Sequence, residues 1–540
     1  MIFMHTDARL LSDFSEIEGD ICIVGAGAAG ISIALQWINT PYKVILLEGG
    51  GFEYDDKVQD LYKGKTTGQG YYPLRSARLH YFGGTTGHWG GCCSIFEPSA
   101  FKKRDWINES GWPFDEKELE PYYKKASDIL DIGEFSFDLA YWQQKDSSLT
   151  ALPLDDKVLY SKIWRHRVPK TLRFGSHYKD VIEQATNIHL YTYANVTEIE
   201  SNESASAVTS IIAKNHTGKS CRVSARYYVL ASCAIQNSRL LLASNKHSPR
   251  GLGNDHDLVG RYFMENLEIK EAELWLKKRS KLKLYERGVS PNVQAELAIT
   301  PEAQVGLQIA NGMLSFTPLE IARKTPPYIK TWTSEDPREA SQRVSEIDEK
   351  ATEGKSRISK LFGPTGYESF MVTLRLEQTP NPLSRITLDT EKDELGVPRA
   401  MLNWALTSME KKSLQSIYRL LGQQVGIAGI GRVKLSEELY DEHSDTMPDS
   451  TSGGWHHMGT TRMHNDPHKG VVDANCKVHG IANLYIAGSS CFTNGAAVNP
   501  TFTIVTLSVR LAEHLKQMVG HGNVVTTSSP GTVKDSHTSP

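Results

Sequence analysis

The stretch from residue 20 to residue 48 constrains the fold more than any other part of the chain. It opens with the apolar run Asp20-Ile-Cys-Ile-Val24, which predicts a short buried strand. The glycine-rich sequence Gly25-Ala-Gly-Ala-Ala-Gly30 follows directly and leads into a helical stretch over residues 31–39. Residues 43–47 predict a second strand. This order of strand, glycine-rich turn, helix and strand indicates a βαβ unit of a parallel sheet.

The three glycines and the acid after the second strand fit the binding of a dinucleotide. Gly25 permits a tight turn, Gly27 lets the backbone approach a pyrophosphate, and Gly30 lets helix and strand pack closely. The N-terminus of the helix offers unpaired N–H groups and the positive end of its dipole to phosphate. Glu48 lies where a carboxylate would accept hydrogen bonds from ribose hydroxyls. This pattern predicts a dinucleotide site without distinguishing FAD from NAD.

Length and composition describe a soluble globular protein with two domains. The 540 residues exceed one ordinary hydrophobic core, and 39% of them are hydrophobic while 23% are charged. No apolar run reaches the roughly 18 residues that a membrane span needs. A net charge of −3 gives no support for a nucleic-acid or anionic-membrane partner.

The ends of the chain and its cysteines bear on location. The first 20 residues contain acids and no long apolar core, unlike a secretory signal. Seven cysteines without a CxxC pair indicate a reducing compartment. The cytoplasm is the expected location, with export on a partner subunit as the alternative. The tail over residues 521–540, rich in Gly, Ser, Thr and Pro, is expected to be disordered.

A second glycine-rich stretch, from Tyr81 to Gly91, also carries aromatic side chains. Five of the nine residues from 83 to 91 are glycine, which favours a loop over a helix or strand. Tyr81, Phe82 and Trp89 are costly to leave in water, so this loop is expected to lie against a flat ligand.

These residues resemble the glucose-methanol-choline (GMC) family of flavin oxidoreductases. The resemblance implies that Gly84, Thr85 and Thr86 lie along the flavin. The pair His88-Trp89 resembles the subgroup that contains pyranose oxidase and the sugar and gluconate dehydrogenases. In pyranose oxidase the matching histidine is bonded covalently to the flavin, and in other members with the same pair it is not. For His88 the non-covalent alternative is favoured.

Two later segments extend the resemblance. Residues 187–199 alternate like a strand, and the resemblance implies that Val196 contacts the adenine. Residues 226–242 predict a strand, a turn and the start of a helix. Cys233 stands where the family usually has glycine. A slightly different turn is expected there, because cysteine tolerates positive φ poorly.

The middle of the chain predicts an antiparallel sheet. Residues 370–377 and 384–388 are strand-like and are joined through Thr379-Pro-Asn-Pro382, which predicts a hairpin. The segment over residues 323–360 is highly charged and poor in large apolar residues. A solvated helix and loop is the favoured interpretation, and a lid over the substrate cleft is the alternative.

The C-terminal part is expected to return to the first sheet. Residues 484–487 predict another buried parallel strand, with Gly488 as its exit turn. Asn499 and Pro500 suit the cap and the first position of a helix that runs to about Val519. If its N-terminus points at a flavin, the helix dipole would stabilise the negative charge that reduction places on the ring. This return favours FAD over a simple NAD domain.

The resemblance is strongest around His456 and Asn499, which match the two catalytic positions of the GMC family. It implies that His456 takes a hydroxyl proton as general base while the flavin takes the hydride, with Asn499 holding the same oxygen. His457 is the alternative base. The cofactor contacts implied at this end of the chain are Gly488, Ser489, Pro500 and Thr501.

The expected architecture is α/β, a GMC fold with a Rossmann-like FAD-binding domain and a second substrate-binding domain built on an antiparallel sheet. The FAD-binding domain is predicted to comprise residues 15–105, 181–265 and 450–520, and the substrate-binding domain residues 106–180 and 266–449. The expected donor is an alcohol group on a sugar, polyol or glycoside. The acceptor is oxygen or another carrier, with an electron-transfer subunit or an oligomer as further alternatives. No metal site and no nucleic-acid partner are predicted.

Four other functions stay open at the level of sequence. The chain could oxidise a non-sugar alcohol, or it could be a flavin-bearing lyase of the same fold. It could be an NAD-linked dehydrogenase that uses only the first motif, or a non-catalytic partner with a vestigial flavin. Bleaching of a bound yellow cofactor by an alcohol would separate alcohol oxidation from the last three of these.

Overall fold

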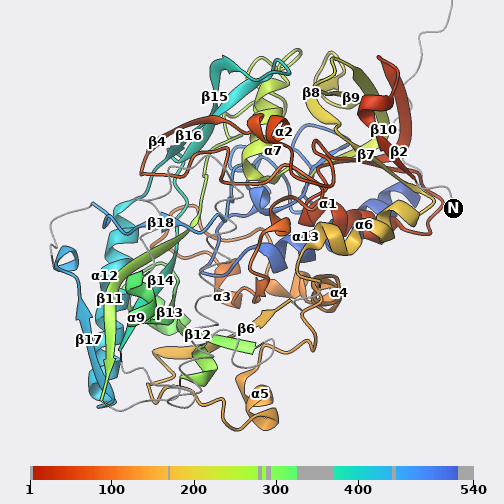
Figure 1. The fold of residues 1–540 in the computed structure, drawn as a ribbon. Coiled ribbons are helices and arrows are strands. Elements are labelled where there is room, and N and C mark those ends of the chain that lie inside the picture. The colour runs from red at the N-terminus through yellow and green to blue at the C-terminus, as the bar shows by residue number, and fades with distance from the viewer. Residues whose placement is uncertain are drawn as a thin grey trace, which may run out of the picture.

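The computed structural model contains two large sheets and one small sheet, with helices packed around them (Figure 1). It describes residues 4–167, 171–277, 282–286, 293–324, 369–440 and 446–520. The predicted disordered tail lies outside these residues. So does the charged segment over residues 323–360, apart from its first two residues.

The first sheet is the parallel sheet predicted from the opening motif. β2 (Ser15–Val24) and β3 (Val44–Leu47) pair in parallel, and α1 (Ala28–Trp37) connects them. The strand order is β1-β7-β3-β2-β10-β9-β8, with β19 also paired to β10, and the β8–β9 hairpin adds the antiparallel edge. The other strands of this sheet are β1 (His5–Asp7), β7 (Ile188–Thr192), β8 (Asn195–Ser201), β9 (Val208–Lys214), β10 (Ser220–Leu230) and β19 (Leu484–Ile486).

The C-terminal helix joins the first βαβ unit, as the sequence predicted. α13 (Thr501–Gly520) packs against α1, and α6 (Phe174–Gln184) contacts α1 as well (Figure 1). Phe502, Val505 and Val509 recur at helical spacing on α13, and all three are fully buried. The dinucleotide motif and the C-terminal helix therefore share one core.

Three local predictions need correction. The strand predicted over residues 187–199 is two strands, β7 and β8, because Tyr193 between them has a φ of 53° and breaks the extended backbone. The first helix begins at Ala28 rather than at residue 31, directly after Gly27. The different turn expected at Cys233 is not seen: this residue begins α7 (Cys233–Ala243) with a φ of 69°, the left-handed backbone that a glycine would adopt there.

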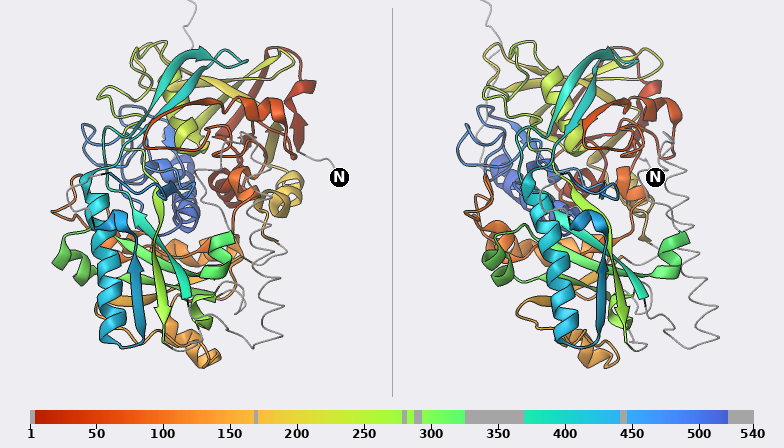
Figure 2. Two further views of the ribbon diagram at one scale, coloured as in Figure 1. Left: turned by 60° about the vertical axis from the view of Figure 1, so that its left-hand side comes forward. Right: turned by 90° about the vertical axis from the view of Figure 1, so that its left-hand side faces the viewer.

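The second sheet is antiparallel throughout and carries the predicted substrate side of the protein. Its order is β17-β11-β14-β13-β12-β6-β5, with β18 paired to β11. α12 (Ser408–Ile427) runs along this sheet (Figure 2), and Tyr418 on it donates its hydroxyl to Ile269 O and Val372 O. The strands are β5 (Cys92–Cys93), β6 (Leu159–His166), β11 (Asn266–Leu276), β12 (Val293–Ile299), β13 (Gly312–Pro318), β14 (Ser369–Glu377), β17 (Gly431–Leu435) and β18 (Ser452–Gly453).

The hairpin predicted between residues 370–377 and 384–388 is wrong. β14 is paired on both sides, with β11 and β13, so no edge remains for the following strand. That strand, β15 (Arg385–Lys392), instead pairs with β16 (Pro398–Trp404), which also pairs with β4 (Gly64–Gly68). Asn381 and Ser384 in the connection donate to Ala405 O and Phe263 O, which redirects the chain between the two sheets.

The remaining helices cover the two sheets and their connections. No helix within the described ranges is long and apolar enough to cross a membrane. The predicted domain boundaries and the cytoplasmic location stay predictions. The helices that cover the sheets and their connections are α2 (Asp56–Asp60), α3 (Pro98–Phe101), α4 (Glu120–Leu130), α5 (Leu139–Lys145), α8 (Pro301–Leu307) and α9 (Leu319–Lys324).

Candidate active site

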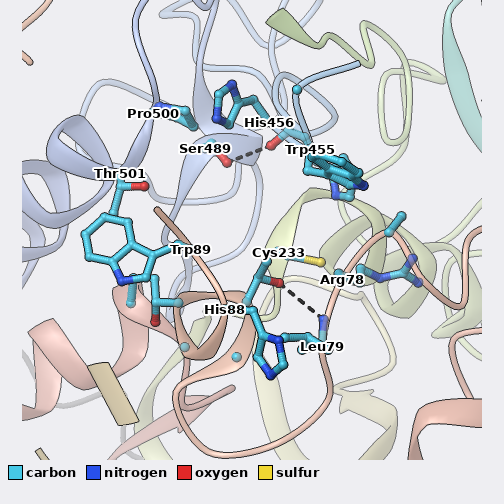
Figure 3. A pocket seen from close by; sticks show the side chains of 18 of the residues that line it. Arg78, Leu79, His88, Trp89, Cys233, Trp455, His456, Ser489, Pro500 and Thr501 are labelled. Carbon is cyan, nitrogen blue, oxygen red and sulfur yellow. Dashed lines mark hydrogen bonds between the residues drawn. The ribbon is translucent and has the colours of Figure 1, made fainter. Parts of the chain in front are cut away.

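A cavity of about 730 Å³ runs from the dinucleotide motif to the face of the antiparallel sheet. Figure 3 shows part of its wall, with His456 and Pro500 on one side and His88 and Leu79 on another. Every residue predicted for the site lines this cavity except Gly30. The lining residues that were predicted are Gly25, Gly27, Glu48, Gly84, Thr85, Thr86, His88, Trp89, Val196, His456, Gly488, Ser489, Asn499, Pro500 and Thr501.

The glycines of the opening motif differ in what a side chain would meet. At Gly30 a Cβ would lie 1.9 Å from Gly25 O, so this glycine is required by close packing of helix and turn. At Gly27 a Cβ would meet no protein atom within 4 Å, although the residue lines the cavity. The open space beside Gly27 is therefore what a ligand at the N-terminus of α1 would fill, and the motif fits a pyrophosphate.

Glu48 performs a structural role that the sequence did not reveal. Its Oε2 accepts a hydrogen bond from the Ala26 N–H at 3.0 Å, and its Oε1 accepts one from the Gly50 N–H at 2.9 Å. The side chain is only 5% exposed, and burial raises the pKa of the carboxyl. Glu48 thus holds the turn before α1, besides lining the cavity where a ribose was predicted.

The second glycine-rich loop closes over the same end of the cavity. Gly84 begins a short 3₁₀ helix, η2 (Gly84–Gly87), with a φ of 52°, and a Cβ there would lie 3.3 Å from Gly27 Cα. Trp89 donates its indole N–H to Leu172 O at 2.7 Å, which fixes the ring beside the cavity. The two glycine-rich segments are brought together, so a flat cofactor in the cavity would contact both.

The two adjacent histidines have different surroundings. The Nδ1 of His456 lies 2.9 Å from Asn266 Oδ1, and its backbone N–H donates to Glu265 Oε2 at 2.6 Å. When Nδ1 carries the proton that Asn266 accepts, Nε2 is left as a neutral acceptor toward the cavity. Burial, with a smaller contribution from Arg375, lowers the pKa of His456 to about 3. His456 is therefore a neutral base across the physiological range.

His457 also lines the cavity, but its side chain is largely buried against aromatic rings. It is 7% exposed, and its ring packs against Tyr71 and Phe263 at centroid distances of 6.2 and 5.7 Å. Its Nε2 is buried, without a hydrogen bond, 3.6 Å from Glu265 Oε1. Burial also lowers the pKa of His457 to about 3. This packing favours His456 over His457 as the group that meets a donor.

Glu265 lies behind both histidines and anchors the segment that carries them. Its carboxyl group is fully buried and accepts the hydroxyl of Tyr71 as well as the His456 N–H. Burial raises the pKa of Glu265 to about 8, against the hydrogen bonds that lower it. Glu265, which is itself held by Tyr71, thus fixes the backbone position of His456.

Asn499 corrects the prediction of a helix cap. Its Nδ2 donates to Cys92 O at 3.3 Å, and its Oδ1 is buried without a hydrogen-bond partner. The side chain therefore accepts no bond from the first turn of α13, which begins at Thr501 with Ile504 N–H donating to Pro500 O at 2.8 Å. Asn499 lines the cavity, so its unpaired oxygen and the second hydrogen of its amide are both available to a ligand there.

The antiparallel sheet supplies charged groups that sequence reasoning missed. Glu268 and Lys270 alternate on β11, so they share one face of the strand, and both line the cavity. Arg375 on β14 lies 2.7 Å from Glu296 Oε2 on β12 and 3.8 Å from Glu268 Oε1. The alternation of charge along residues 266–270 was the available signal. Its pairing with β14 could not be known from the sequence.

Comparisons with known proteins agree with this arrangement. Residues 380–508 match the family model described as GMC oxidoreductase. The 2-methyl-1,2-propanediol dehydrogenase of Mycolicibacterium austroafricanum is 24% identical to this chain over 569 residues, which cover 93% of this chain and 95% of that protein. The 6'''-hydroxyparomomycin C oxidase of Streptomyces lividus is 23% identical, covering 92% of each chain. The solved structure of pyridoxine 4-oxidase from Mesorbium loti matches with a TM-score of 0.54 at 16% identity, covering 92% of this chain and 99% of that one.

A dinucleotide fold whose cavity continues onto an antiparallel sheet, with a neutral histidine on its wall, defines an oxidoreductase of the flavin-binding class. The C-terminal part of the chain matches the GMC oxidoreductase family, a family of FAD-binding flavoproteins, and relatives that match over most of its length are named as a diol dehydrogenase and a hydroxyparomomycin oxidase. The predicted resemblance to the GMC oxidoreductases, the fold class and the type of enzyme are confirmed.

Proposed function

We propose that this protein binds FAD and oxidises an alcohol group of a polyhydroxylated donor such as a sugar, polyol or glycoside. The observation that carries the proposal is the Asn266–His456 contact, which leaves a neutral ring nitrogen on the wall of the cavity. The relatives support the donor class, since one is named for a diol and another for an aminoglycoside.

The residues on the cavity wall have separate roles in the proposed reaction. FAD, when bound, supplies the hydride acceptor. His456 takes the hydroxyl proton at Nε2, while Asn266 holds the proton at Nδ1 and so fixes the tautomer. Asn499 donates one amide hydrogen to Cys92 O and uses the other to hold the donor oxygen in place. The N-terminus of α13, which includes Thr501, presents its positive end to the cavity.

The test of this function is anaerobic bleaching of the bound flavin by a panel of alcohols. Sugars, polyols and glycosides are expected to bleach it, and simple monohydric alcohols and NADH are not. Returning the bleached protein to air, and then adding a dye acceptor, separates an oxidase from a dehydrogenase. A yellow protein that no alcohol bleaches would contradict alcohol oxidation and favour the lyase or the vestigial alternative.

Glu268 is expected to bind donor hydroxyl groups remote from the reacting carbon. Its carboxylate lines the cavity and lies 3.8 Å from Arg375, which leaves oxygen lone pairs for a donor. Glu268→Gln should raise the KM for the donor on the order of tenfold, because a hydrogen bond to a charged group is worth about 1.5–3 kcal/mol. Bound FAD and the bleaching rate at saturating donor should stay unchanged.

The matched control is Glu271→Gln, which alters an acid on the same strand that does not line the cavity. An equal rise in KM in both variants would mean that Glu268 acts through the fold rather than through the donor.

We also propose that FAD is held without a covalent bond to His88. The His88 Nδ1 is buried without a hydrogen-bond partner, so no acceptor orients the ring as nucleophilic histidines require. Burial, with Arg173, lowers the pKa of His88 to about 4. Acid precipitation of the purified protein is expected to release the yellow colour to the supernatant. Colour retained in the pellet of the native protein and lost from that of His88→Ala would overturn this proposal.

A further inference from the structure

Cys92, on the wall of the cavity, is paired with His166, and the alcohol oxidation uses neither side chain. Cys92 Sγ lies 3.2 Å from His166 Nδ1, and the two residues face each other in the pairing of β5 with β6. A thiol within hydrogen-bonding distance of an imidazole can pass its proton to the ring and become the nucleophilic thiolate. This is the geometry of an activated cysteine.

The surroundings of Cys92 include a cation, Arg375, and access to the cavity. Burial acts to lower the pKa of the Arg375 guanidinium, but the charges of Glu296, Glu268 and Cys92 together raise it. A cation near a cysteine favours the thiolate form. Cys92 is half-buried and lines the cavity, and its carbonyl oxygen accepts the amide of Asn499. The thiol is therefore on the donor side of the cavity.

The other six cysteines provide the contrast. Five of them are buried: Cys22, Cys93, Cys221, Cys476 and Cys491. Burial raises the pKa of Cys221 to about 11 and that of Cys93 further, so these thiols stay protonated. Cys233 is half-buried and also lines the cavity, next to Ser232 and Ala231 at the dinucleotide end, where bound FAD would cover it.

We propose that Cys92, activated by His166, is a modification site for small uncharged electrophiles that enter the donor part of the cavity. In the reaction with iodoacetamide the Cys92 sulfur forms a bond to the CH₂ carbon, and the carbon–iodine bond breaks. Iodide leaves with that bonding pair, and the thiol proton passes to His166 Nδ1. The adduct occupies the space beside Asn499, so it excludes the donor while leaving the dinucleotide end of the cavity open. The labelling itself does not depend on the proposed function; only its effect on donor oxidation does.

The experiment treats the FAD-loaded protein with iodoacetamide at pH 7 and follows all seven cysteines by peptide mass spectrometry. Cys92 is expected to react about tenfold faster than Cys233, and His166→Asn is expected to slow labelling of Cys92 by a similar factor. Labelled protein should keep its flavin and lose bleaching by the donor. Cys92→Ser keeps the backbone carbonyl that Asn499 contacts, and iodoacetamide should not lower the bleaching rate of this variant further, whereas Cys233→Ser should be inactivated as the native protein is.

Three results would overturn the proposal. The first is an unlabelled Cys92 in protein that has reacted elsewhere. The second is labelling of Cys92 at the same rate in His166→Asn, with the variant shown to be folded by its bound flavin. If His166→Asn fails to fold, the pH dependence of labelling in the native protein replaces it. A rate that follows an ordinary thiol pKa near 8.5 is then the contradicting result. A different result would count against the proposed function alone. In that case Cys92 is labelled as expected, but no alcohol donor bleaches the flavin even in the untreated protein.

Discussion

Gly27→Val is expected to give a folded protein that binds no FAD. The backbone at Gly27 has a φ of −84° and a ψ of −166°, which any residue can adopt. A Cβ there meets no protein atom within 4 Å, so the substitution costs the fold little. The added methyl groups would project into the cavity at the N-terminus of α1, where the pyrophosphate has to approach the backbone. The purified variant should be colourless, should not take up added FAD, and should melt close to the native apoprotein.

The matched control is Gly70→Val. Gly70 is exposed, and a Cβ there also meets no atom within 4 Å, but the residue does not line the cavity. This variant should stay yellow. Gly30→Ala provides the opposite case, because its Cβ would lie 1.9 Å from Gly25 O and should lower stability itself. Yellow Gly27→Val protein with native FAD content would show that the dinucleotide lies elsewhere in the cavity.

The parts of the fold that could be predicted are those in which the local sequence pattern and the tertiary contacts favour the same secondary structure and pairing. The opening βαβ unit has apolar strands, a glycine turn and a helix in sequence, and the structure has all three. The hairpin after residue 377 shows the limit. Its two strands are correct in type, but strand pairing is set by which edges are free, and both edges of β14 are occupied. A sequence pattern does not reveal an occupied edge.

In the candidate site, too, local motifs could be predicted from the sequence and long-range contacts could not. His456 could be found by its motif, because the histidine lies within a local run of residues. Asn266, which contacts it, lies 190 residues earlier in the chain and could be found only through the pairing of β11 with β18. Asn499 was expected to cap α13, since asparagine before proline is typical of a helix start. Its amide instead donates to Cys92 O, because β5 passes beside the helix terminus.

The change of the bleaching rate as the pH is lowered tests whether His456 is neutral. An exposed histidine would be half-protonated near pH 6.5 and would lose its capacity as a base below that value. Burial lowers the pKa of His456 to about 3, so the neutral form persists as the pH falls through 6.5. The rate at saturating donor is therefore expected to be level between about pH 7 and pH 5, below the pKa of about 8 of Glu265, over the range in which the protein stays folded. A fall by half near pH 6.5 would indicate that the base is an ordinary, solvated imidazole.

His456→Ala is expected to keep its FAD and to be bleached by the donor about 10²–10⁴-fold more slowly, the usual cost of losing a general base. The flavin should stay bound because the glycines and Glu48, which are proposed to contact the dinucleotide, lie at the other end of the cavity. Asn499→Ala should cost less, because it removes a hydrogen bond to the donor oxygen and leaves the proton acceptor in place. Each rate is measured anaerobically at saturating donor, after the FAD content of the variant has been determined.

His457→Ala is the matched control for the base, since it removes the neighbouring imidazole, which also touches the cavity but is only 7% exposed and packs against Tyr71 and Phe263. Loss of its packing against Tyr71 and Phe263 should lower the melting temperature, while the bleaching rate falls by less than about tenfold. The reverse pattern, a normal rate in His456→Ala and a slow one in His457→Ala, would move the base by one residue. Normal rates in both variants would mean that the hydroxyl proton leaves by a route through neither histidine.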